Sequence, residues 1–204
     1  MRNFLIGLVL FFAGLAAIML IPSPQEPAPM PWEITVMPDG NIEVFDIHIG
    51  TTTYRQAQQQ LKQYGETAIF SQEGKIPDVE AYFDSINLGG LSAKLVLNLA
   101  AEQDQITEMM STALEARLQP SGAHQYELSN EANNQLIDAI VLGITYIPSV
   151  KLNHDMLRHR FGEPNKVETI EASETELWLY NDKQLSIRVN PHEKTILQYK
   201  LKTP

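Results

Sequence analysis

The 204-residue chain contains no cysteine. This absence excludes disulfide bonds, thiolate metal ligands and cysteine nucleophiles. It also excludes the lipid-bearing cysteine that holds a bacterial lipoprotein at a membrane. Basic residues are scarce as well, since 15 Lys and Arg stand against 25 Asp and Glu, and the formal net charge is -10. Because phosphates repel an acidic surface, no nucleic-acid partner is expected.

Motifs of common active sites are missing too. The chain has no G-x-S-x-G, no P-loop and no EF-hand spacing. Among the five histidines, His154 and His159 are five residues apart on an expected helix, roughly 140° around its axis, whereas a helical metal pair is three or four apart. We therefore predict no catalytic residue, cofactor site or metal site. A hydrolase or metal-dependent enzyme built from His154, His159 and Glu163 remains an alternative.

One long apolar run is present. Residues 4–21, FLIGLVLFFAGLAAIMLI, contain no charge, and as a helix they would extend roughly 27 Å, close to the hydrocarbon thickness of a bilayer. Arg2 precedes the run and the next basic residue is Arg55. The positive-inside rule then predicts a cytoplasmic N-terminus at 1–3 and an ectodomain on the other side. We expect a single-pass protein of the bacterial inner membrane with a periplasmic ectodomain.

The alternative to a retained anchor is a cleaved signal peptide. Ala16 and Ala17 could form part of a cleavage site, but this would leave Ile18 to Ile21 on the new N-terminus, and the run is long for a signal peptide. Residues 22–32, PSPQEPAPMPW, alternate with proline and predict a stiff extended linker. A proline-rich ligand for a partner groove is the other interpretation of this segment.

The part after the linker divides into two expected α+β units, in which helices pack on antiparallel meander sheets. The acidic excess lies almost entirely in residues 33–143, the first unit, whereas residues 144–204 are nearly neutral. In the first unit the patterns predict strands at 41–49, 67–71, 79–86 and 91–99, and helices at 54–64, 103–118 and 130–143. Thr53 and Gln56 form a capping box for the first of these helices, with Ala57, Leu61 and Tyr64 inward.

In the second unit Asn153 is the expected N-cap of a short helix that carries Met156, Leu157 and Phe161. Strands are expected at 166–172, 175–181, 184–189 and 195–201. If Tyr180 pairs with Leu185, and Ile187 with both Trp178 and Leu197, then one face carries Trp178, Tyr180, Leu185, Ile187, Val189, Leu197 and Tyr199. A slip by one residue would mix them with polar side chains, so the pattern selects this register.

The segment from about Asn130 to Leu201 resembles the SmpA/OmlA (BamE) family of outer-membrane-assembly proteins. The resemblance is carried by FGEP at 161–164, by Trp178 and Tyr180, and by the alternating LSIRV at 185–189. It implies two helices against a three-stranded antiparallel sheet, the fold that also builds the tandem beta-lactamase inhibitor protein. Residues 33–143 resemble a weaker copy of the same unit. The family's lipid-bearing cysteine is absent, so the resemblance concerns the fold more than the function.

These observations favour an envelope protein whose ectodomain binds another protein, with a role in envelope assembly or maintenance as the expectation. The face opposite Trp178 and Tyr180 would mix apolar and basic side chains, as protein-binding surfaces do. The expected partner-binding residues are Leu177, Leu179, Arg188, Ile196 and Lys200. If the first unit covered this face, the two leucines would lie in an internal seam instead. A protein that binds lipid or another apolar ligand between sheet and helices is a further alternative.

Overall fold

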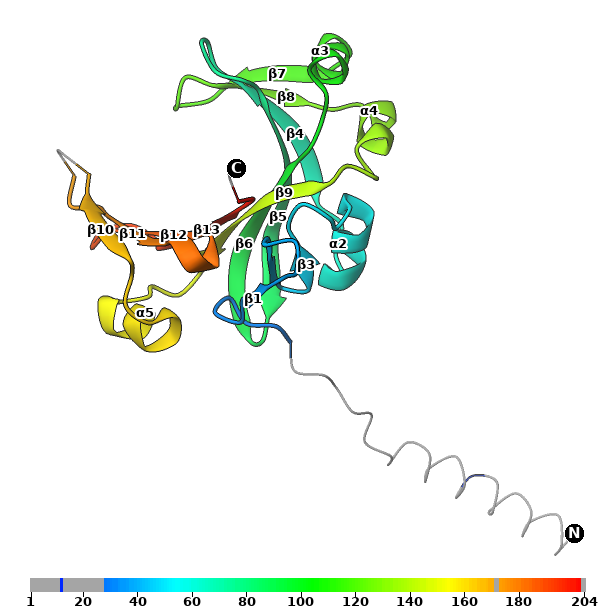
Figure 1. Cartoon of the computed structure of the whole chain (residues 1–204). Helices are drawn as coiled ribbons and strands as arrows, with labels where there is room; N and C mark the ends of the chain where they lie inside the picture. Colours follow the sequence, from blue (N-terminus) through cyan, green and yellow to red (C-terminus); the bar gives the residue numbers. More distant parts are fainter. Residues whose placement is uncertain (1–11, 13–27, 171–172, 203–204) are drawn as a thin grey trace, which may run out of the picture.

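A computed structural model describes residue 12 and residues 28–170 and 173–202 of the chain (Figure 1). In this part no helix is long and apolar enough to cross a membrane. The expected anchor at 4–21 lies outside the described residues except for Phe12. The first six residues of the expected linker, 22–27, lie outside them as well.

The described chain is an α+β structure dominated by one large antiparallel sheet, as the sequence predicts at the level of fold class. The sheet has ten strands in the order β10-β11-β12-β13-β9-β6-β5-β4-β8-β7. In chain order these strands are β4 (Glu66–Ser71), β5 (Asp78–Leu88), β6 (Leu91–Leu99), β7 (Glu115–Leu118), β8 (His124–Glu127), β9 (Val141–Pro148), β10 (Lys166–Thr169), β11 (Glu176–Tyr180), β12 (Leu185–Val189) and β13 (Ile196–Lys200).

The remaining elements are short. A separate three-stranded sheet consists of β1 (Thr35–Val36), β2 (Ile42–Val44) and β3 (Ile47–His48). Four α-helices are described, α2 (Tyr54–Leu61), α3 (Gln103–Ser111), α4 (Asn130–Gln135) and α5 (His154–Phe161), together with a 3-10 turn, η1 (Asn181–Lys183).

Strand β9 joins the two expected units. It pairs with β6 along one edge and with β13 along the other. The expected boundary between residues 143 and 144 therefore falls inside a strand, and the two units share a single sheet. Pairing of β9 on both edges leaves neither half with an open strand there, where unpaired backbone groups would be exposed.

Two expected helices are shorter than predicted, because each gives way to a strand. The helix expected at 103–118 ends at Ser111, where the hydroxyls of Ser111 and Thr112 both donate to the Glu108 carbonyl, and β7 follows. The helix expected at 130–143 ends at Gln135, and Val141 begins β9. The spacing of apolar residues in a short segment fits both a helix and a strand. Here the segments form strands because neighbouring strands of the sheet pair with them.

Smaller differences concern turns. The strand expected at 41–49 is the hairpin of β2 and β3, because Phe45 and Asp46 both have positive φ, 56° and 59°, as in a type I′ turn. Helix α2 ends three residues early, with Lys62 in the left-handed region at φ 53°. Tyr64 is consequently 87% exposed instead of inward. Met156 on α5 is also largely exposed, at 45%.

The predicted register of the C-terminal strands is confirmed. Tyr180 pairs with Leu185, Trp178 with Ile187, and Ile187 with Leu197. Each of these side chains is at most 3% exposed. The caps on Thr53 and Asn153 are also present as predicted, since each side chain accepts a backbone N–H of the first helical turn.

The large sheet is strongly curved, and helices α2, α4 and α5 lie on its outer, convex side (Figure 1). The convex face carries the core, to which the small sheet contributes through Phe45, packed 5.2 Å from the Tyr146 ring and 6.1 Å from the Tyr199 ring. Alternation along each strand sends the intervening side chains to the opposite, concave face. No described helix lies on that face in Figure 1.

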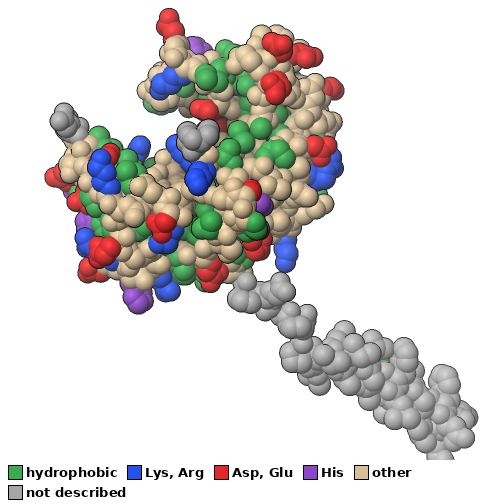
Figure 2. Space-filling view, in the orientation of Figure 1, with side chains coloured by type: hydrophobic (Ala, Val, Ile, Leu, Met, Phe, Trp, Pro, Cys, Tyr) green, Lys and Arg blue, Asp and Glu red, His purple; other side chains and the backbone are tan. Residues whose placement is uncertain are grey.

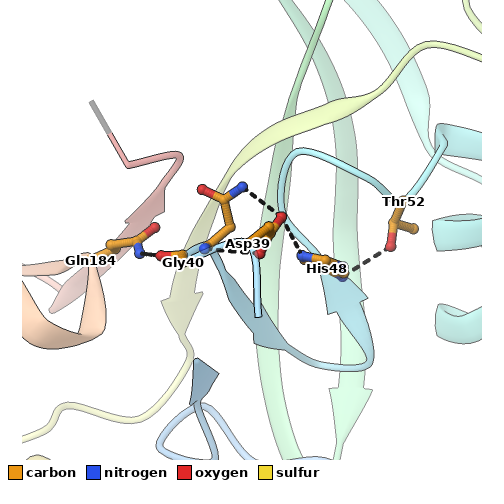
Figure 3. Close-up of polar contacts among 6 residues, drawn as sticks. Asp39, Gly40, His48, Thr52 and Gln184 are labelled. Carbon is orange, nitrogen blue, oxygen red and sulfur yellow. Dashed lines mark hydrogen bonds and ion pairs between the residues drawn. The ribbon is translucent and has the colours of Figure 1, made fainter. Parts of the chain in front are cut away.

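The N-terminal segment is tied to the C-terminal strands by polar contacts (Figure 3). Asp39 accepts from Asn41 and lies 3.0 Å from the His48 ring, which fixes the turn before β2. The Gln184 side chain then donates to the carbonyl oxygen of Gly40 at 2.6 Å. These contacts, with the Tyr199 hydroxyl donating to the Pro31 carbonyl at 2.6 Å, hold the first described segment against β13.

Candidate functional site

The five residues expected to bind a partner lie together on the concave face. Arg188 is paired with Leu177 on one side and with Ile196 on the other, so these three cross β11, β12 and β13 in one row. Leu179 lies in the next row along β11, and Lys200 lies further along β13. Arg188 and Lys200 are exposed, whereas the three apolar side chains are partly exposed.

The apolar surface continues beyond the predicted set. On β9 the partly exposed Ile147 pairs with Lys94, and Thr145 pairs with Val96, which is also partly exposed. Thr145 pairs with Gln198 on its other side, so this row runs on toward Leu179 through β12. The floor of the curved sheet therefore has apolar side chains across β11, β13, β9 and β6. We call Leu177, Leu179, Ile196, Ile147, Val96, Arg188 and Lys200 the concave patch.

The two cations of the concave patch have no ion-pair partner among the described residues. In contrast, Lys94 lies 3.0 Å from Asp84, and Lys166 lies 2.6 Å from Glu168 on the same face. Figure 2 shows the hollow between the two arms of the molecule, with basic side chains at its base.

The other arm of the concave face has a different character. Glu80 on β5 is partly exposed and receives a hydrogen bond from the hydroxyl of Tyr82, two residues along the strand. Burial raises the pKa of the Glu80 carboxyl, and the nearby Asp78 raises it further, against the lowering effect of the Tyr82 hydrogen bond. Burial likewise raises the pKa of Tyr82, whose ring lies 5.8 Å from Phe70.

In the structure His154 and Glu163, two residues of the metal alternative, contact different side chains. His154 stacks on Trp178 at 5.2 Å and its Nε2 lies 3.2 Å from Glu176. Glu163 instead pairs with Arg158, which also lies over the Trp178 ring at 5.0 Å. Among the described residues no group of three or more His, Cys, Asp and Glu side chains could hold a metal ion. His154 and Arg158 therefore cover the indole of Trp178.

A cavity of about 910 Å³ opens beside α2, α4 and β4. Amide side chains line much of it, including Gln58, Asn133 and Asn134. The Thr67 hydroxyl donates to the Asn133 side chain, and the Tyr54 hydroxyl donates to the Gly65 carbonyl at 2.8 Å. Apolar side chains, among them Phe70, Leu128 and Ile137, line other parts of it, so the cavity is mixed in character.

Comparisons with protein-family models, with curated proteins and with solved structures found no match. The concave patch therefore stands on geometry alone. Sequence reasoning missed Ile147 because 141–143 were expected to end a helix and 144–148 were assigned to no strand. It could have found Val96, since Lys94, Val96 and Asn98 alternate with buried leucines in a strand that was predicted with the correct bounds.

Proposed function

We propose that this chain is a membrane-anchored envelope protein whose ectodomain binds a segment of another protein on the concave patch. The observation that carries the proposal is the combination of partly exposed apolar side chains with Arg188 and Lys200, on a face that none of the described helices covers. An apolar centre beside charged groups is the usual composition of a protein-binding surface.

The chemistry of the patch indicates its partner. Apolar side chains of the partner would cover Leu177, Leu179 and Ile196, and carboxylates would pair with Arg188 and Lys200. Arg and Lys are favourable partners for carboxylates when the pair is shielded from water. We therefore propose an acidic segment with apolar side chains as the occupant.

The membrane context belongs to the same proposal. Residues 4–21 would be the transmembrane anchor in the inner membrane, and the proline-rich linker at 22–32 would hold the folded part off the bilayer in the periplasm. We also propose that the ectodomain consists of two BamE-like segments. Both α2 and α5 are followed by an antiparallel meander, and the carbonyls of Gly65 and Gly162 each accept a tyrosine hydroxyl.

Site-specific photo-crosslinking in cells tests the proposal. A photoreactive residue at Ile196 of the full chain should give an adduct, whereas the same residue at Met156, on convex helix α5 and 45% exposed, should not. Mass spectrometry of the adduct should identify an acidic, apolar segment. The double variant Arg188→Glu, Lys200→Glu should abolish the adduct. Equal adducts from Met156, or an adduct that the charge reversal leaves unchanged, would contradict the proposal.

A further inference from the structure

Strand β7 forms one end of the ten-stranded sheet and pairs only with β8. All four of its residues are exposed, and the leucines at and beside its ends, Leu114 and Leu118, are 67% and 68% exposed. An edge strand with exposed apolar side chains can accept another strand through its unpaired backbone groups. The sequence of this edge indicates which strand would fit.

The backbone orientation of β7 follows from the last pair of its hairpin. The N–H of Gln119 donates to the Ala123 carbonyl at 2.8 Å, so residue 119 directs its backbone groups toward β8. Alternate residues of an antiparallel strand direct theirs to the same side. The intervening residues, Ala116 and Leu118, therefore direct their N–H and C=O groups toward the open edge.

The edge is self-complementary when two copies of it pair antiparallel about Ala116. The segment reads Leu114, Glu115, Ala116, Arg117, Leu118. In this register each Glu115 lies opposite an Arg117 of the second copy. Leu118 lies opposite position 114, but the Leu114 N–H already donates to the Glu127 carbonyl at 2.8 Å, so the backbone pairing ends before Leu114. Opposite charges and apolar side chains in directly opposed positions both stabilise antiparallel pairs. The central pair joins the two Ala116 residues, whose backbone groups point outward.

Neighbouring two-fold registers do not fit. A two-fold axis at Glu115 would oppose two glutamates, and an axis at Arg117 would oppose two arginines. Those residues also direct their backbone groups toward β8, where they cannot bond to a second copy. Charge and backbone orientation thus select the same register.

The opposite edge of the sheet is a natural comparison. Strand β10 also alternates charge, as Lys166, Val167 and Glu168, but its central Val167 is only 46% exposed. Its flanking residues, Asn165 and Thr169, are polar, so a second copy there would gain less apolar burial. We propose that two copies of this chain associate through β7, antiparallel and centred on Ala116, with a two-fold axis perpendicular to the sheet.

Disulfide formation in the full chain tests the register directly, because the natural sequence has no cysteine. Ala116→Cys should give a disulfide-linked dimer under mild oxidation, since opposed α-carbons in a hydrogen-bonded pair lie about 5.5 Å apart, within disulfide range. Leu114→Cys and Leu118→Cys are the matched controls. They are similarly exposed, one just before β7 and one at its end, but in this register each thiol is roughly 13 Å from its own copy along the strand, so they should not link.

A second experiment exchanges the charges at positions 115 and 117 in the Ala116→Cys variant. Glu115→Lys places a lysine opposite Arg117 at both ends of the paired segment. This repulsion should lower the initial rate of disulfide formation at least about tenfold. Adding Arg117→Glu restores both pairs and should restore the rate. Linkage of all three positions at similar rates, no linkage at position 116, or a rate that the charge variants leave unchanged would overturn the proposal. If Val167→Cys formed the linked dimer faster than Ala116→Cys, the contact between copies would be at β10, and the proposal would be overturned as well.

Discussion

At the scale of single residues, two neighbouring tyrosines show how differently a buried hydroxyl can be accommodated. Tyr146 and Tyr199 are both 0% exposed, and both rings contact Phe45. The Tyr199 hydroxyl donates to the Pro31 carbonyl, whereas the Tyr146 hydroxyl has no partner among the described residues. A buried polar group without a hydrogen bond destabilises the folded state.

We predict opposite effects of removing these two hydroxyls. Tyr146→Phe should leave the free energy of unfolding unchanged or raise it by about 1 kcal/mol, because it removes an unsatisfied donor. Tyr199→Phe should lower it by about 1–2 kcal/mol, because the Pro31 carbonyl loses its donor. Chemical denaturation of the detergent-purified full chain measures both. A larger loss for Tyr146→Phe than for Tyr199→Phe would be inconsistent with these contacts.

Glu80 gives a prediction about pH. Its pKa in the folded protein is raised by burial, so the folded state binds the proton more tightly than the unfolded chain does. The stability that the neutral carboxyl provides is present at acidic pH and is lost as the pH rises through the raised pKa. Glu80→Gln stays neutral, so it should be more stable than the natural protein at pH 7, by no more than about 1 kcal/mol.

The advantage of Glu80→Gln should shrink as the pH falls below the carboxyl's ordinary range, which thermal unfolding at several pH values can follow. Glu73→Gln removes an exposed glutamate between β4 and β5 and should change stability by less than about 0.5 kcal/mol. A constant difference between Glu80→Gln and the natural protein at all pH values would show that burial of this carboxyl does not affect stability.

At the scale of elements, the sequence predicts well wherever a local signal is sufficient. Caps at Thr53 and Asn153 and the alternation of β11 to β13 all depend on neighbours within a few residues. The ends of the helices expected at 103–118 and 130–143 depend instead on strand pairing. Strand β7 forms a hairpin with β8, the next strand in the chain, and β9 pairs with β6, which lies far from it in the chain. Apolar spacing within a segment does not reveal its pairing partners, so β7 and the first three residues of β9 were expected to be helical.

The cap of α5 provides a test at this scale. The Asn153 side chain accepts the Met156 N–H at 2.9 Å, and α5 covers Trp178 with His154 and Arg158. Asn153→Ala should lower the free energy of unfolding by about 1 kcal/mol, because the first turn loses its acceptor. Met156→Ala, which removes a largely exposed side chain from the same helix, should cost less. If the two variants were equal in denaturant titrations, the cap would not contribute as the structure indicates.

At the scale of the whole molecule, one curved sheet joins what the sequence suggests are two units. All five predicted site residues lie on its concave face. Their face follows from the register of the C-terminal strands, which the sequence predicts correctly. The apolar surface on β9 and β6 could not be assigned to that face from sequence, since it requires the pairing of β9 with both halves. The concave patch is therefore larger than the predicted site.

The proposed anchor leads to a prediction about the mature chain. Residues 4–21 are long enough to span a bilayer and only Arg2 precedes them as a basic residue, so the mature protein should keep this segment. The intact mass of the membrane-extracted protein checks this. A mass that corresponds to cleavage between Ala13 and Met30 would show that the segment is a signal peptide.

The central claim is that the concave face is open to solvent and available to a partner. The most direct measurement is the thermal unfolding midpoint of Leu179→Glu in the full chain, compared with Trp178→Glu. Leu179 is partly exposed, so its glutamate should reach water and cost less than about 1.5 kcal/mol, a shift of a few degrees. Trp178 is 1% exposed, and an unpaired carboxylate there should unfold the protein. A fall in the Leu179→Glu midpoint as large as that of Trp178→Glu would show that the face is buried, and it would contradict the account.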